Sequence, residues 1–172
     1  MHFDLKSVIR DIPDFPKKGI VFKDITTLLK HPQALNIALQ GMAAPFVHSG
    51  VNHVVGIESR GFMFGVSAAQ TLKCGFVPIR KAGKLPSETY RVDYELEYGT
   101  SQLAIHKDAI EPGENVVIMD DLLATGGTMD AAIQLVTQCG GDVVGISCLI
   151  ELTFLNGRGK LGNIPFHTLI QY

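Results

Sequence analysis

The sequence VVIMDDLLATGGT, residues 116–128, joins an apolar run to two adjacent acids and then to a loop of small residues. The apolar run is typical of a buried strand, and the segment 128–139 that follows has the spacing of an amphipathic helix. The start of a helix presents unpaired N–H groups and a partial positive charge, which favour an anion. We therefore interpret the loop as a cradle for a phosphate monoester, formed by Ala124, Thr125, Gly126, Gly127 and Thr128.

Asp120 and Asp121 need a different role, because a carboxylate beside a bound phosphate repels it. Ionised carboxylates only accept hydrogen bonds, and vicinal sugar hydroxyls are suitable donors. A phosphate in the loop and a cis-diol at the acids together describe a ribose 5-phosphate. The alternative is a helix-capping turn with two solvated acids, but the combination of strand, acid pair and glycine-threonine loop favours the sugar phosphate.

Short apolar runs alternate with helical patterns along much of the chain. Strands are predicted at 53–58, 76–80, 116–120 and 143–152, and helices at 32–48, 62–72 and 128–139. Strands that are apolar on both faces and alternate with helices indicate an α/β fold with a mostly parallel central sheet and helices on both faces. Ligands bind beyond the carboxyl ends of such strands, where the acid pair is expected to lie.

The remaining segments are less regular. Leu5, Val8, Ile9 and Ile12 recur at helical spacing, with Asp4 as N-cap. Residues 14–27 predict an ordered loop with a short strand at its middle, residues 81–94 a mobile polar loop, and residues 94–110 a hairpin around Gly99. The chain contains no repeat and no low-complexity linker, so we expect a single domain over residues 1–172.

Composition excludes several classes of protein. A net charge of −2 gives no bulk attraction to nucleic acid or to an anionic membrane. No apolar run approaches the roughly 18 residues of a membrane span, and the N-terminus does not resemble a signal peptide. The three cysteines share no metal-like spacing, which indicates reduced thiols in a cytoplasmic protein; they are Cys74, Cys139 and Cys148.

Two nucleotide-binding motifs can be rejected. The phosphate loop is not a Walker loop, because no Gly-Lys-Ser/Thr follows it. GRGKLG, residues 157–162, fits G-x-G-x-x-G, but Asn163, Ile164 and Pro165 follow where a helix should open. No acid lies about 20 residues further on, so the dinucleotide interpretation fails.

Residues 116–128 match the phosphoribosyl-diphosphate signature of the type I phosphoribosyltransferases. Other segments resemble the members that use adenine as the base: DFPKKGIVFKDIT, GIESRGFMFG, PIRKAGKLP, YELEYG and ELTFLNGRGKL. The resemblance covers nearly the whole chain. It implies purine salvage, in which the 5-phosphoribosyl group of 5-phosphoribosyl 1-diphosphate passes to adenine and gives AMP and diphosphate. It also implies Mg²⁺, held mainly by substrate oxygens and water, and a homodimer.

The resemblance assigns the diphosphate to a set of cations, some of them from the neighbouring subunit. Arg suits a multi-oxygen anion. By its segment alone, Arg60 would be a surface residue paired with Glu58, and RKAGK a solvated charge cluster. The implied diphosphate-binding residues are Ser59, Arg60, Arg80, Lys81 and Lys84, and Arg60 is also implied to be catalytic.

The base site implied by the resemblance lies under a small hood of about residues 12–30. Phe22 stacks on adenine, the main chain of Val21 and Lys23 reads the base edge, and Leu152 covers the opposite face. By pattern alone, a lone Phe or a strand-end Leu is usually a core residue.

The catalytic loop implied by the resemblance is the flexible segment 81–98, a lid that excludes water. Glu97 lies in it, with Tyr98 beside it against the base. Glu97 either handles the purine's imidazole proton or orients the base, and a Glu can do both. Spacing alone favours an exposed hairpin edge.

Three alternatives remain. The first is the same chemistry with another base, such as hypoxanthine, guanine or xanthine, against which the Phe22 hood and the Glu97 loop argue. The second is a regulator that senses phosphoribosyl diphosphate and binds RNA or DNA, which needs a basic surface or a further domain. The third is a structural relic that binds nothing, which the intact acid pair and loop disfavour.

Overall fold

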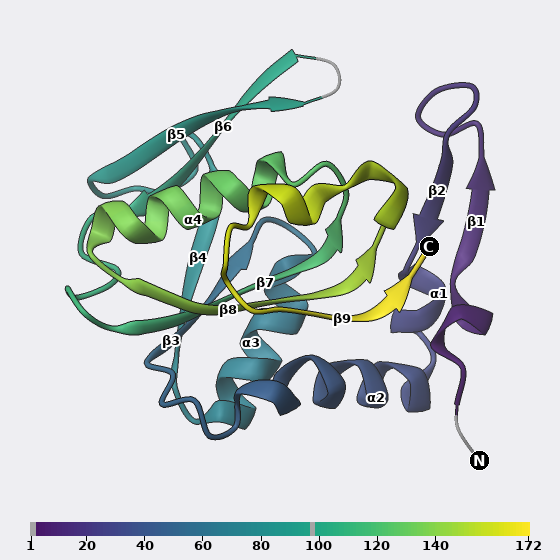
Figure 1. The fold of residues 1–172 in the computed structure, drawn as a ribbon, viewed down its shortest axis with the longest axis horizontal. Helices are drawn as coiled ribbons and strands as arrows, with labels where there is room; N and C mark the ends of the chain where they lie inside the picture. Colours follow the sequence, from purple (N-terminus) through teal and green to yellow (C-terminus); the bar gives the residue numbers. More distant parts are fainter. Residues whose placement is uncertain (1–2, 97–98) are drawn as a thin grey trace.

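A seven-stranded sheet forms the centre of the part of the chain that the computed structural model describes, residues 3–96 and 99–172 (Figure 1). Five neighbouring strands are parallel, and the hairpin β5–β6 joins antiparallel at one edge. In spatial order the strands are β5 (Thr89–Leu96), β6 (Gly99–His106), β4 (Gly75–Lys81), β3 (His53–Ile57), β7 (Asn115–Leu123), β8 (Asp142–Glu151) and β9 (Phe166–Gln171). The predicted mostly parallel sheet is confirmed.

Helices cover both faces of this sheet, as predicted. Helices α2 (Pro32–Ala43) and α3 (Gly61–Leu72) lie on one face, and α4 (Gly127–Cys139) lies on the other (Figure 1). Helix α2 starts with proline at its first turn, and the short 3-10 helix η2 (Ala44–Phe46) follows it directly. Among the described residues, no helix is long and apolar enough to cross a bilayer.

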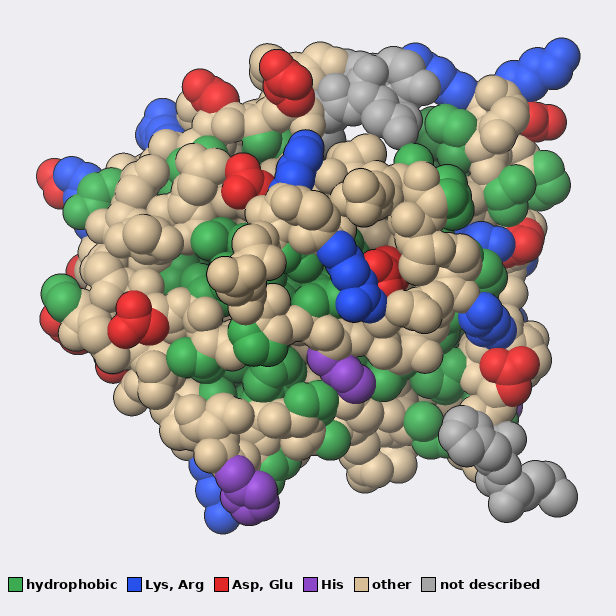
Figure 2. Space-filling view, viewed as in Figure 1, with side chains coloured by type: hydrophobic (Ala, Val, Ile, Leu, Met, Phe, Trp, Pro, Cys, Tyr) green, Lys and Arg blue, Asp and Glu red, His purple; other side chains and the backbone are tan. Residues whose placement is uncertain are grey.

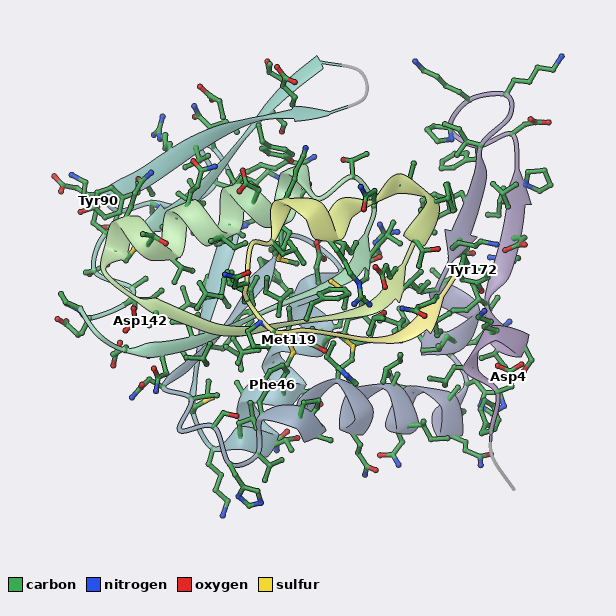
Figure 3. The ribbon with its side chains drawn as sticks, viewed as in Figure 1. Asp4, Phe46, Tyr90, Met119, Asp142 and Tyr172 are labelled. Atoms are coloured by element: carbon green, nitrogen blue, oxygen red, sulfur yellow. The ribbon has the colours of Figure 1, made fainter. Side chains whose placement is uncertain are left out.

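The core has two sides because β7 is buried on both faces. Ile118 packs in the cluster on the α4 side, with Leu135 of that helix. Met119, the next residue, packs with Phe46 and Ala68 on the opposite side (Figure 3). Successive side chains of a strand point to opposite faces, so a strand between two helical layers must be apolar throughout. This burial explains the uninterrupted apolar run that precedes the acid pair.

The predicted hood is a separate two-stranded sheet, in which β1 (Arg10–Pro13) pairs antiparallel with β2 (Val21–Asp24). Helix α1 (Thr26–Leu29) follows β2. Asp24 holds the base of the hood, since it accepts hydrogen bonds from the Thr26 N–H and from the Arg10 guanidinium. Led by the Thr26 bond, these interactions lower the pKa of Asp24 to about 2.

The hood also contacts the edge of the main sheet. Tyr172 follows β9, beside β2 (Figure 3), and the Lys23 ammonium lies 3.9 Å from the centroid of its ring. The Lys6 ammonium lies 5.0 Å from the same centroid. The Lys23 contact ties the hood, and the Lys6 contact the segment before it, to the sheet edge where the parallel strands end.

Two predictions for the less regular segments were wrong. The pattern of Leu5, Val8, Ile9 and Ile12 gives only the 3-10 helix η1 (Leu5–Val8), although Asp4 caps it as predicted and accepts from the Lys6 N–H. Ile12 lies in β1, because pairing with β2 competes successfully with a helix of marginal length. Residues 89–94 are not a loop but most of β5, which pairs along its whole length with β6.

Two further corrections concern the strands near the site. Strand β7 extends to Leu123, three residues beyond the predicted end at Asp120, so Asp121 also lies inside the strand, which pairs with β8. A further strand, β9, follows β8 and forms the sheet edge, although no strand was predicted after residue 152. Short strands at a sheet edge carry a weak sequence pattern, since one of their sides is solvent.

Candidate active site

A cavity of about 1090 Å³ opens at the carboxyl ends of the parallel strands. Its wall combines the hood, the ends of β3 and β7, the β7–α4 loop and the segment after β8. The predicted site residues in this wall are Val21, Phe22, Lys23, Ser59, Arg60, Lys81, Asp120, Asp121, Ala124, Thr125, Gly126, Gly127, Thr128 and Leu152. Most of the residues predicted from dispersed segments therefore meet in one place.

The loop 124–128 connects β7 to α4, as predicted. Gly126 has a left-handed backbone, with φ +82°, and its carbonyl oxygen accepts the Asp130 N–H at 2.9 Å. A Cβ atom at this position would lie 2.5 Å from the carbonyl oxygen of Gly157. Both the conformation and the close approach therefore require glycine. The resulting helix start, lined by Thr125 and Thr128, is suited to an anion.

The acid pair lies at the cavity wall, with Asp121 buried and Asp120 half-buried. Asp121 is 6% exposed, its N–H donates to Asp120 Oδ1 at 2.8 Å, and its own Oδ2 lies 2.9 Å from Arg60 Nε. Burial and the neighbouring charge of Asp121 raise the pKa of Asp120 well above its usual range. Burial also raises the pKa of Asp121, against the opposing effect of Arg60. The surroundings therefore disfavour the charged form of the pair, and hydrogen-bond donors from a ligand would stabilise it.

The pairing of Arg60 with Glu58, which the segment alone favoured, is wrong. Arg60 pairs with Asp121, and its guanidinium carbon lies 5.5 Å from the centroid of the Phe22 ring. This side chain starts directly before α3, at the end of β3, and reaches across to β7. Arg60 therefore lies between the acid pair and the hood.

Glu58 organises the cationic segment instead. Its Oε2 accepts the Lys81 N–H at 3.0 Å and Arg80 Nε at 3.2 Å, and its Oε1 accepts Lys84 Nζ at 3.1 Å. Burial alone would raise the pKa of Glu58, but these bonds outweigh it and leave the pKa lowered. The Glu58 carboxylate thus holds these cations in defined positions, whereas the segment alone favoured a solvated charge cluster. In the described part of the chain, Lys81 lines the cavity, whereas Arg80 and Lys84 reach it only through Glu58.

The hood presents an aromatic surface to the cavity. Phe22 is half-buried and meets the Phe15 ring edge-on, with centroids 5.2 Å apart. The Lys23 ammonium pairs with Asp11 at 2.8 Å and lies over the Tyr172 ring, so its charge is engaged by these two partners. Leu152 faces the cavity from the end of β8, where its N–H donates to the Leu123 carbonyl at 2.9 Å.

Glu97 and Tyr98 lie outside the described residues. The strand that leads to them ends beside the phosphate loop, because a Cβ atom at Gly127 would lie 3.0 Å from the carbonyl oxygen of Glu95. Tyr94 on the same strand lines the cavity. The end of β5 thus lies at the site.

Sequence reasoning did not identify several residues of the cavity wall. Glu58 was named only as a partner of Arg60, although its position before Ser59 at a strand end could have indicated the site. Tyr94, Phe154, Leu155 and Tyr172 also line the cavity. No local pattern separates such aromatic and apolar residues from core residues, since only the meeting of strand ends brings them together.

Comparison with known proteins agrees with this geometry. The family described as phosphoribosyl transferase domain matches residues 26–160. The adenine phosphoribosyltransferase of Cyanothece sp. is 54% identical over 169 residues, which cover 98% of this chain and 99% of the relative.

Solved structures show the same likeness. The adenine phosphoribosyltransferase of Rhodothermus marinus has a TM-score of 0.92 and 53% identity, covering 98% of this chain and 96% of that one. That of Saccharomyces cerevisiae, complexed with an imino-altritol bisphosphate and adenine, has a TM-score of 0.88 and 43% identity, covering 95% of each chain. With the strand, acid pair and phosphate loop in place, these matches show that the chain belongs to the adenine phosphoribosyltransferase family.

Proposed function

We propose that the protein catalyses, in this cavity, the transfer of the 5-phosphoribosyl group from 5-phosphoribosyl 1-diphosphate to adenine. The products are AMP and diphosphate, and the reaction serves purine salvage. A ring nitrogen of adenine attacks the anomeric carbon, the bond from that carbon to the diphosphate oxygen breaks, and the imidazole proton of the base leaves. The observation that carries this proposal is the meeting of a helix start suited to an anion, an acid pair and an aromatic hood in one cavity.

The phosphate loop and the acid pair hold the ribose 5-phosphate. Residues 124–128 offer main-chain N–H groups and the hydroxyls of Thr125 and Thr128 to the 5-phosphate. Asp120 and Asp121 accept hydrogen bonds from the two ribose hydroxyls. Holding the sugar at both ends orients the anomeric carbon, and such positioning supplies much of the rate of a displacement reaction.

The cations stabilise the leaving diphosphate. Arg60 and Lys81 line the cavity beside Ser59, and the ion pair of Arg60 with Asp121 keeps its guanidinium near the reacting carbon. Negative charge grows on the diphosphate as the bond breaks, so fixed cations lower the barrier. Arg80 and Lys84 contribute through the cluster centred on Glu58.

The hood binds the base. Phe22 stacks on one face of adenine, Leu152 covers the other, and main-chain groups of Val21 and Lys23 read the base edge. The proposal for Lys23 is supported by its ammonium, which is engaged elsewhere. Glu97 handles the imidazole proton or orients the base, with Tyr98 beside it. Segment 81–98, in which residues 89–96 form strand β5, closes over the cavity as a lid.

Mg²⁺ fits this donor set. The cavity wall offers hard carboxylate oxygens from Asp120 and Asp121, and among the described residues no group of three His, Cys, Asp or Glu could hold a metal ion. Such a site suits an ion that keeps its waters and is carried mainly by the substrate. When bound, it would neutralise charge on the diphosphate.

The assembly we propose is a homodimer of single-domain chains. Met63 and Val66 on α3 are 43% and 53% exposed, which suits an apolar contact. Arg80 and Lys84 are partly exposed beside the cavity, where they can serve a neighbouring subunit.

A cytoplasmic location is supported by Cys74, Cys139 and Cys148, all of which are free thiols. The acidic and basic side chains are interspersed on the face in Figure 2, which gives no support to a nucleic-acid surface.

The test is a diphosphate-release assay with Mg²⁺ and phosphoribosyl diphosphate against adenine, hypoxanthine, guanine, xanthine, uracil and orotate, with products identified by chromatography. We expect AMP from adenine alone. Activity with another base would keep the sugar-phosphate site and reject the base pocket. Tight binding of phosphoribosyl diphosphate without turnover would favour the sensor, and a melting temperature that no ligand raises would favour the relic.

A further inference from the structure

The segment after β8 contains an ion pair that the proposed reaction does not use. This segment forms two 3-10 turns, η3 (Thr153–Leu155) and η4 (Gly157–Lys160), in place of the dinucleotide-binding helix excluded above. Arg158 returns to Glu151 at the end of β8, with Nε 2.5 Å from Oε1 and Nη2 2.7 Å from Oε2. Gln171 of β9 donates to the same Oε2 at 2.9 Å. A two-pronged contact therefore closes the segment into a loop.

The two partners differ in burial. The Glu151 side chain is 5% exposed, whereas Arg158 is 48% exposed and its guanidinium carbon lies 4.7 Å from the centroid of the Phe166 ring. The hydrogen bonds between them lower the pKa of Glu151 and raise that of Arg158. Both groups thus stay charged, and the planar guanidinium fork gives the contact a fixed direction.

The closed loop touches both substrate regions. At one end, Leu152 follows Glu151 and lines the cavity on the base side. At the other end, the Gly157 backbone, next to Arg158, lies directly against the phosphate loop. A Cβ atom at Gly157 would overlap the Ala124 carbonyl oxygen, and one at Gly126 would lie 2.5 Å from the Gly157 carbonyl oxygen. The ion pair therefore joins the residue before Leu152 to the residue after Gly157.

We propose that Arg158 is a positioning residue which, through Glu151, fixes Leu152 against the base and Gly157 behind the phosphate loop, so that one ion pair supports binding of both substrates. The inference rests on the proposed function for the identity of what binds at each end. The proposal also gives a role to Gly157 and Arg158, the first two residues of the GRGKLG pattern that does not bind a dinucleotide.

The test compares Arg158→Gln and Arg158→Lys with Lys107→Gln as a matched control. Lys107 is 46% exposed, pairs with Glu88 at 3.3 Å and lies 5.8 Å from the centroid of the Tyr90 ring, but Glu88 is 82% exposed. The control thus removes a cation of similar exposure whose partner is solvated. The readouts are KM for adenine, KM for phosphoribosyl diphosphate, kcat, melting temperature and calorimetric affinity for ribose 5-phosphate.

We expect Arg158→Gln to raise both KM values by about tenfold and to weaken ribose 5-phosphate similarly, because small displacements of positioning groups have large effects. Arg158→Lys, which keeps the charge but loses the fork, should fall between this variant and the wild type, and Lys107→Gln should stay within about twofold of wild type. If Arg158→Gln does not fold, Arg158→Lys decides by the same comparison.

Unchanged KM values with a lowered melting temperature would overturn the inference and leave a purely structural ion pair. A rise in only one KM would refute the coupling of the two regions. If the wild-type protein forms no AMP, the proposed function fails first, and the ribose 5-phosphate titration still tests the contact between Gly157 and the phosphate loop.

Discussion

Replacing Gly126 by alanine should perturb the phosphate loop in two separable ways. Its φ of +82° is left-handed, a conformation that costs an L-residue about 1–2 kcal/mol. The new Cβ would also lie 2.5 Å from the Gly157 carbonyl oxygen, which belongs to the backbone and cannot rotate away. Relief of such an overlap by backbone shifts typically costs about 1–3 kcal/mol. We expect Gly126→Ala to lose about 2–5 kcal/mol of unfolding free energy in total.

Gly113 supplies the matched control. Its φ is +83°, and a Cβ atom there would meet no heavy atom within 4 Å. Gly113→Ala should therefore lose only the conformational part, about 1–2 kcal/mol, and keep its KM for phosphoribosyl diphosphate. Urea denaturation measures the first quantity and steady-state kinetics the second. Equal losses of stability in the two variants, or an unchanged KM in Gly126→Ala, would refute the argument that Gly157 holds the loop in place.

Three other predictions concern the hood and the acid pair. Phe22→Ala should raise the KM for adenine about tenfold and leave that for phosphoribosyl diphosphate unchanged, since stacking on a base contributes about 1–3 kcal/mol; equal effects on both KM values would contradict the stacking role. Because the pKa of Asp120 is raised, the calorimetric affinity for ribose 5-phosphate should fall as the pH is lowered. Asp121→Asn removes a neighbouring charge that raises this pKa, so the loss of affinity should begin at a lower pH in the variant. A purely structural role of the pair predicts no such shift. The pKa of Asp24 falls from 3.8 to about 2 on folding, so its stabilisation is complete above pH 3.8 and is lost as pH falls toward 2. It amounts to about 1 kcal/mol after allowance for the solvent around Arg10, and acid denaturation of Asp24→Asn should lack that component.

Much of the fold could be predicted because its pattern is local. Strands β3, β4, β7 and β8 and helices α2, α3 and α4 have lengths and apolar periods that burial on both sides of the sheet imposes on consecutive residues. Elements with one solvent face or few partners were missed or misjudged, including β9, most of β5 and the N-terminal 3-10 turn. Their form depends on pairing with distant segments, which a local pattern does not contain.

The sequence by itself determined the local structure of the proposed phosphate loop and acid pair. A strand, two carboxylates, small residues and a helix start are contiguous, and only the order of neighbouring residues is needed to create an anion-binding turn beside hydrogen-bond acceptors. The resemblance extended this reading to the base and the diphosphate.

Only the tertiary structure decided which charges meet. Arg60 pairs with Asp121 and not with its neighbour in sequence Glu58, which instead gathers Arg80 and Lys84. The contact of Lys23 with the Tyr172 ring likewise joins opposite ends of the chain. Long charged side chains can satisfy many partners, and their choice follows from which strand ends the sheet brings together and which carboxylates it buries.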